Sequence, residues 1–115
     1  MRTVFHVSTT DQLSYVDAKV TNLLADDSLT VTAVAVVVDN PAVIDAAAGG
    51  DGRERVETVL AAGGDDADTA VRVCANALRG ATATLEDLPA GVERASSGVG
   101  ELTRLQADGW SYIRP

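Results

Sequence analysis

Six consecutive apolar residues, 33–38, restrict the fold of this 115-residue chain more than any other feature of its sequence. They read AVAVVV and form the second half of a strand that we expect over residues 29–38. Because its side chains are apolar on both faces, this strand must lie between two layers, as the strands of parallel sheets do. The strand should end at Asp39-Asn40-Pro41, since proline has no N–H to donate to a neighbouring strand.

Strand-like and helical segments alternate along the rest of the chain. Runs rich in β-branched or aromatic residues predict strands over 2–8, 69–74, 92–95 and 110–114. Apolar residues at helical spacing predict helical segments over 11–26 and 53–62, and a last helix that ends at Gly109. A short helical stretch is expected between 76 and 88. The alternation predicts one domain over 1–115 with an α/β fold, a three-layer α/β/α sandwich around a five-stranded parallel sheet.

Two local details complete this expectation. Thr9 is expected to cap the first helix, with Gln12 as the second member of a capping box. Residues 41–52 should form one alanine-rich helical turn followed by a glycine-rich loop.

The chain is acidic, with a net charge of −8 and a pI near 4.3. An acidic surface repels phosphate backbones and anionic headgroups, so neither nucleic acid nor a membrane is an expected partner. No apolar stretch approaches the length of a membrane span. Aspartate outnumbers glutamate twelve to five and Lys19 is the only lysine, a composition that resembles cytosolic proteins of extreme halophiles.

Cys74 is the only cysteine, so the chain cannot form an intramolecular disulfide, and a reducing, cytoplasmic location is expected. It ends a strand-like apolar run. In open parallel sheets, ligands and chemistry gather at the carboxyl ends of the strands. A lone cysteine is also often an inert core residue, and position alone does not choose between the two interpretations.

The residues that follow two other expected strands should lie near Cys74, at the same edge of the sheet. Ser8 and Thr9 follow the first strand. The last helix opens with a glycine-rich segment: Ser96, Ser97, Gly98, Val99 and Gly100. Backbone N–H groups at such a helix start can bind an anion, and a thiolate or persulfide beside them would be stabilised. The segment lacks a phosphate-loop pattern, and a plain helix cap explains it as well.

Other polar residues are weaker candidates. His6 is either an acid or base that serves Cys74 or a hydrogen-bonded core residue. Arg79 either binds an anion or is an exposed structural residue, and Glu101 is expected to complete the cap of the last helix. The acidic loop 65–68 lacks the spacing of a calcium site, and no Cys/His pair has zinc spacing, so neither a metal nor a cofactor is expected.

The C-terminal segment 96–115 reads SSGVGELTRLQADGWSYIRP and resembles the signature of the small archaeal DsrE/DsrF-like proteins. Those chains close with Ser-Ser-Gly-Val-Gly, an arginine and a glutamine in the next helix, then Glu-Gly-Trp/Tyr-Ala-Tyr-Ile-Arg-Pro. CANALR over 74–79 matches their Cys-x-Asn-x-Leu-Arg element. Similarity extends to VFH over 4–6 and NLLAD over 22–26, so the resemblance covers essentially the whole chain.

The resemblance implies a three-layer fold with five parallel strands, usually assembled as trimers or hexamers. In sulfur-relay members of that family, a cysteine that matches Cys74 accepts a sulfane sulfur as a persulfide and passes it on. Some relatives carry a second cysteine two positions earlier, where this chain has Arg72. A disulfide cycle within one subunit is therefore excluded. The loop 63–68 also departs from the family pattern, because it is longer and more acidic.

Three functional hypotheses follow. The first is a sulfur-relay protein in which Cys74 is the sulfur acceptor, Asn76 and the backbone amides of 97–100 orient the anion, and sulfur-donor and acceptor proteins are partners. The alternative is a non-enzymatic module that binds a small anion, or assembles subunits, through the same strand-end pocket. The third is a structural oligomer with a buried Cys74, whereas the first predicts a Cys74 that is partly accessible beside residues 96–100. A core of alanine and valine with few aromatics favours a homo-oligomer, a trimer before a hexamer.

Overall fold

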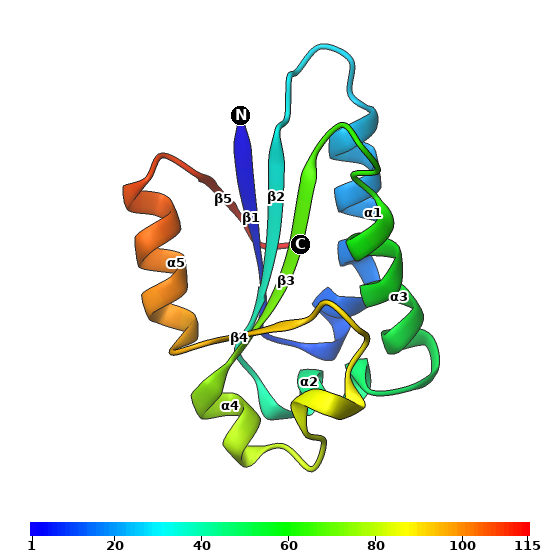
Figure 1. Ribbon diagram of the computed structural model, residues 1–115, viewed down its shortest axis with the longest axis vertical. Coiled ribbons are helices and arrows are strands. Elements are labelled where there is room, and N and C mark those ends of the chain that lie inside the picture. Colours follow the sequence, from blue (N-terminus) through cyan, green and yellow to red (C-terminus); the bar gives the residue numbers. More distant parts are fainter.

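The computed structural model describes residues 1–115 and contains one sheet of five parallel strands (Figure 1). In chain order the strands are β1 (Arg2–Val7), β2 (Ala33–Val38), β3 (Asp68–Cys74), β4 (Glu93–Ala95) and β5 (Ser111–Ile113). Their spatial order is β4-β3-β2-β1-β5. The apolar strand β2 therefore lies at the centre of the sheet, where both of its faces are covered.

Helices cover both faces of this sheet. They are α1 (Thr10–Ala25), α2 (Pro41–Ala47), α3 (Gly50–Ala61), α4 (Ala75–Gly80) and α5 (Gly98–Ala107), with one 3₁₀ turn, η1 (Leu85–Asp87). Figure 1 shows α1 and α3 on one side of the sheet and α5 on the other. The predicted three-layer α/β/α sandwich with a five-stranded parallel sheet is confirmed. None of the helices has the length and apolar character that crossing a membrane requires.

The two faces of the sheet are packed unequally. A cluster of 18 buried residues, with Val36 and Val38 of β2 at its centre, lies under α1, α2 and α3. The face under α5 has a cluster of five buried residues, against which Trp110 packs. Since hydrophobic stabilisation grows with the apolar area removed from water, the larger cluster supplies most of it.

Two expected boundaries are wrong. The strand expected over 29–38 begins only at Ala33, because residues 26–29 form a turn in which the Leu29 amide donates to the Asp26 carbonyl. The glycine-rich segment expected to be a loop instead begins α3. A Cβ on Gly52 would overlap the Ala46 carbonyl, so glycine lets α3 approach α2. The short helical stretch expected between 76 and 88 is present as α4, which begins one residue earlier, and the 3₁₀ turn η1 follows it.

The cap of α1 follows the prediction in part. The Thr9 hydroxyl accepts the N–H of Gln12 at 3.0 Å, as expected of a helix cap. The Gln12 side chain, however, accepts the N–H of Ser8 at 2.7 Å instead of that of Thr9.

The predicted capping role of Glu101 is wrong. Its carboxylate is buried and pairs with Arg72 of β3 at 2.7 Å and with Arg104 of α5. Arg72 also lies 3.4 Å from Glu93 of β4. The arginine in the middle of β3 points toward α5, so the nearest acidic side chain of the helix turns inward to neutralise it. This ion-pair network holds α5 against the β3–β4 side of the sheet.

Candidate functional site

Four side chains form one row at the carboxyl edge of the sheet. The strands β1, β2 and β3 stay in register to their ends, so Ser8, Asp39 and Cys74 lie side by side. The Asp39 amide continues the register by donating to the Val7 carbonyl at 3.3 Å. β4 adds Ala95, which pairs with Cys74. Alternation along β1, β2 and β3 directs Ser8, Asp39 and Cys74 toward α5, because the residue before each of them belongs to the cluster on the other face. Cys74 also packs against that cluster.

Cys74 lies beside the start of α5, as predicted, but it is nearly buried. Cys74 is the last residue of β3 and the N-cap of α4. A Cβ on Gly98 would lie 3.3 Å from the Cβ and 3.7 Å from the Sγ of Cys74. Only 7% of the residue is exposed, less than the partial access expected from the sequence, because Gly98 covers it on one side and apolar core residues on the other.

The segment 96–100 is both a helix cap and a source of free amides. Ser97 is the N-cap of α5, and its hydroxyl accepts the N–H of Gly100 at 2.9 Å. The N–H groups of Gly98 and Val99 have no partner within the chain. The plain cap and the anion site, which the sequence left as alternatives, therefore use different amides of one segment.

His6 is buried within a cluster of polar side chains. Its Nε2 lies 2.6 Å from Asp39 Oδ2 and 3.0 Å from Ser8 Oγ, and its Nδ1 lies 2.6 Å from the Tyr112 hydroxyl. Sequence reasoning named His6 and Ser8 but missed both other members. Asp39 was interpreted only as the end of a strand, and Tyr112 only as part of the last strand. The register of β1 with β2 and β5 is the signal that would have identified them.

Two other predicted residues, Thr9 and Asn76, point elsewhere. Thr9 is exposed and caps α1. Asn76 is exposed, and its Oδ1 accepts a hydrogen bond from Arg79 Nη1 at 2.7 Å. The Asn76 side chain is thus held against its own helix by Arg79, and no contact joins it to the Cys74 thiol.

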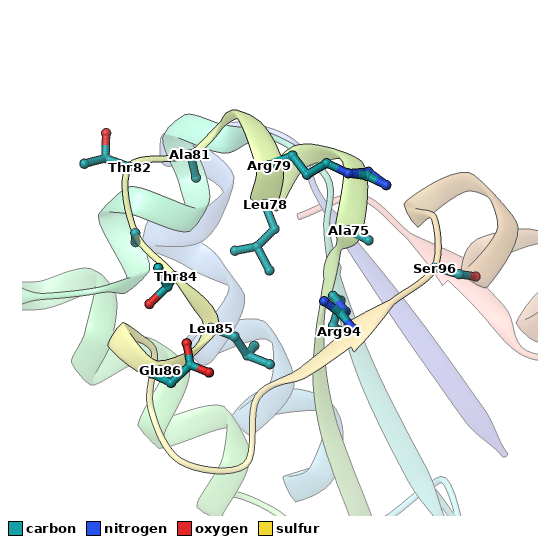
Figure 2. A pocket seen from close by; sticks show the side chains of 11 residues that line it. Ala75, Leu78, Arg79, Ala81, Thr82, Thr84, Leu85, Glu86, Arg94 and Ser96 are labelled. Carbon is teal, nitrogen blue, oxygen red and sulfur yellow. The ribbon is translucent and has the colours of Figure 1, made fainter.

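A groove of about 1040 Å³ opens beside Cys74, between α4, the segment 81–86 and β4 (Figure 2). It is lined by Ala75, the residue after Cys74, and by Ser96. Figure 2 shows the side chains of Arg79 and Arg94 extending on the same side of the groove, near Ala75. Sequence analysis did not single out Arg94, which forms no ion pair, because an arginine in a short edge strand carries no distinguishing pattern.

Taken together, the edge offers a thiol, two free backbone N–H groups and a histidine paired with a carboxylate. Such groups suit nucleophilic chemistry on a small anionic substrate. No three His, Cys, Asp or Glu side chains are arranged to hold a metal ion.

No family model matches the chain, and no curated protein does. A solved structure is similar over almost its whole length: a protein of unknown function, MTH1491, from Methanobacterium thermoautotrophicum. The two chains are 31% identical, the match covers 99% of this chain and 98% of the archaeal one, and the TM-score is 0.79. By this likeness in sequence and fold, the chain belongs to the same family as that archaeal protein of unknown function.

Proposed function

We propose that this protein is a sulfur-relay protein that carries a sulfane sulfur as a persulfide on Cys74. The observation that carries the proposal is that the thiol lies close to Gly98, at the first turn of α5, where an added Cβ would be 3.7 Å from the Cys74 Sγ. The free N–H groups of Gly98 and Val99 can bind the terminal sulfur of an ionised persulfide, and the helix dipole favours the same charge. The resemblance to DsrE/DsrF-like proteins points to the same cysteine.

Sulfur loading is a transfer between two sulfur atoms. The Cys74 thiolate attacks the outer sulfur of a donor persulfide, R–S–SH, and the bond between the two donor sulfurs breaks. The products are Cys74–S–SH and R–S⁻, so one sulfur atom moves and no external oxidant is needed. Attack by an acceptor nucleophile on the outer sulfur of Cys74–S–SH reverses the process and restores the thiolate.

The sulfur must then pass to a partner molecule. Cys74 is the only cysteine, so no second thiol of the same chain can release the sulfur by forming a disulfide. A donor protein, an acceptor protein and a reducing compartment such as the cytoplasm are the setting in which a single carrier thiol works.

Intact-mass spectrometry tests the proposal. Native protein incubated with glutathione persulfide should gain the mass of one sulfur atom, and cyanide should then remove that sulfur as thiocyanate. Cys74→Ser, in which an oxygen replaces the sulfur, is the matched control and should gain nothing. Loading of the urea-unfolded chain but not of the native one would contradict the proposal and favour a merely buried Cys74.

The groove supports a second candidate function, the non-enzymatic binding of a small anion. Although the chain has a net charge of −8, the groove is lined by two arginines, Arg79 and Arg94, and by one acidic residue, Glu86. Calorimetric titration with phosphate and with thiosulfate should detect binding that Cys74→Ser retains. Arg94→Gln should lose it, whereas Arg114→Gln, an equal change of charge at an exposed residue outside the groove, should not. Equal affinities in both arginine variants would contradict this candidate.

A homo-oligomer, a trimer before a hexamer, is part of the proposal. Tyr112 and Ile113 are each 39% exposed on β5, an edge strand, and Val99 is 72% exposed at the start of α5. An exposed apolar edge favours association. Light scattering in molar potassium chloride should give three or six times the chain mass. A mass of 11.8 kDa would contradict the oligomer, and a dimer would contradict the trimer.

A further inference from the structure

We infer that the groove between α4, the segment 81–86 and β4 binds an organic anion with an apolar body. Arg79 and Arg94 hold its acid group, and Leu78 and Leu85 contact the apolar body. This inference rests on the second candidate function and deepens it, because it names the class of ligand and divides the groove into two subsites. It is independent of sulfur transfer on Cys74.

The two arginines have N–H groups to spare. The Arg94 guanidinium forms neither an ion pair nor a hydrogen bond within the chain, so all of its N–H groups can bind a ligand. Arg79 uses only Nη1, which donates to Asn76 Oδ1 at 2.7 Å. Figure 2 shows both side chains on the same side of the groove. Guanidinium groups bind carboxylate and phosphate oxygens in pairs, so this end of the groove fits an acid group.

The acidic residues of the chain do not cancel this positive charge. Glu86 of η1 forms no ion pair with either arginine, and Figure 2 shows its carboxylate apart from their guanidinium groups. Residues 1–68 carry twelve acidic and four basic side chains, whereas residues 69–115 carry five of each. The groove is built from the second part, where the charges balance. An anion therefore meets less repulsion there than over the rest of the surface.

The remainder of the groove is apolar and too large for an inorganic ion. Leu78 of α4 and Leu85 of η1 line it and are only half-buried, and Figure 2 shows both side chains pointing into it. Its volume of about 1040 Å³ is that of a site for a small organic molecule. Phosphate or thiosulfate alone would leave the two leucines in contact with water. An apolar body attached to the acid group would cover them, which is favourable.

One wall of the groove is fixed before any ligand binds. It is the segment between α4 and η1, which is neither helix nor strand. The carboxylate of Asp45, from α2, accepts the N–H of Ala83 at 2.8 Å and that of Thr82 at 3.0 Å. The Asp87 carboxylate accepts the N–H of Thr84 at 2.8 Å. A wall held in this way needs no ordering when a ligand binds, and two nearby carboxylates are engaged with the backbone.

Calorimetric titration with a matched set of probes tests the inference. Hexanoate and hexyl phosphate carry both parts of the ligand, acetate and inorganic phosphate carry only the acid group, and hexanol carries only the apolar body. Each hexyl anion should bind at least about tenfold more tightly than its short counterpart, because each methylene group that leaves water contributes about fourfold. Hexanol should bind at least about tenfold more weakly than either hexyl anion, since it lacks the charge. The tighter of the two hexyl anions identifies the acid group as carboxylate or phosphate.

Two variants separate the subsites. Leu85→Ala should weaken hexyl phosphate binding at least about threefold and leave that of inorganic phosphate unchanged, which also shows that the variant is folded. Arg94→Gln should weaken the binding of both probes at least about tenfold. Leu24→Ala is the matched control for Leu85→Ala, because Leu24 is a half-buried leucine of α1 outside the groove. Its affinities should equal those of the wild type.

The outcomes distinguish this inference from the candidate function on which it rests. Equal affinities of the hexyl anions and their short counterparts would overturn the inference and leave a site for small anions. Equal effects of Leu85→Ala and Leu24→Ala on hexyl phosphate binding would also overturn it, because the apolar body would then lie elsewhere. Undiminished binding of both phosphate probes to Arg94→Gln, or no binding of any probe to the wild type, would overturn the inference and the anion site together.

Discussion

The two faces of the sheet differ in what their residues do. The face under α1, α2 and α3 is apolar almost throughout, with its 18-residue buried cluster. The face under α5 has only five buried apolar residues, but it holds the Arg72–Glu101 ion pair and the hydrogen-bonded His6. One helix covers the second face where several cover the first.

The two faces therefore have different roles: the apolar face mainly stabilises the fold, and the face under α5 carries the groups of the candidate site. Polar and charged groups are costly to bury, and a face that carries them stabilises the fold less than an apolar face of the same area. The sheet tolerates such groups near α5 because its other face supplies most of the hydrophobic stabilisation. We therefore expect substitutions on the apolar face to change folding and substitutions in the polar row to change the behaviour of Cys74.

The largest expected effect is on the apolar face. Ile44 of α2 is fully buried, so Ile44→Ala should lower the free energy of unfolding by about 2–5 kcal/mol, through lost burial and the cavity it leaves. Thr103→Ala, at an exposed position of α5, is the control and should change it by no more than about 0.5 kcal/mol. Urea denaturation in molar salt measures both. Equal effects would remove the distinction between the faces.

Removing one partner of the ion pair on the other face should destabilise the fold more than replacing both partners with apolar residues. Arg72→Met leaves the buried Glu101 with Arg104 alone, and we expect a loss of about 1–3 kcal/mol. Adding Glu101→Leu should recover at least half of that loss, because no buried charge then remains unpaired. A double-mutant cycle from urea curves gives the coupling. Additive losses in the double variant would show that the pair does not act as a unit.

A substitution at Gly98 should affect both stability and chemistry. A methyl group there would press on Asp39 and Cys74 and occupy space that we propose for the outer sulfur of the persulfide. Gly98→Ala should cost about 1–3 kcal/mol and slow sulfur loading. Gly49→Ala, which meets nothing within 4 Å, should cost less than about 1 kcal/mol and leave loading unchanged. Unaltered loading in Gly98→Ala would place the sulfur elsewhere.

The smallest effect concerns acid stability far from either face. Hydrogen bonds from the backbone amide and hydroxyl of Thr84 lower the pKa of Asp87 below its ordinary 3.8. A lowered pKa in the folded state stabilises the protein above the unfolded-state pKa, and this contribution is lost as the pH falls through the folded-state pKa. The Tm of Asp87→Asn should therefore fall less than that of the wild type between about pH 6 and pH 3. Parallel melting curves over that range would contradict the assignment.

The sequence predicts the fold well because its main signals are local. The apolar run 33–38 requires a two-sided cover, and the alternation of segments leaves few topologies. The candidate site is harder to predict because it depends on register between strands that are distant in sequence. Cys74 and Gly98 were identified from strand ends and glycines, whereas Asp39 and Tyr112 join His6 only once the pairing of β1 with β2 and β5 is known. Glu101 was misassigned because its spacing suits a helix cap, whereas its carboxylate in fact forms an ion pair with Arg72.

The rate of sulfur loading on Cys74 in two variants tests the account most directly. Gly98→Ala adds one methyl group beside Cys74, and Ile44→Val removes one methylene from the apolar face. With glutathione persulfide and intact-mass detection, we predict that Gly98→Ala loads more slowly than the wild type, because the added methyl group crowds the Cys74 sulfur. Ile44→Val should load at the wild-type rate. Equal loading rates in both variants, or no loading of the native wild type, would contradict the claim that the row under α5 carries the chemistry.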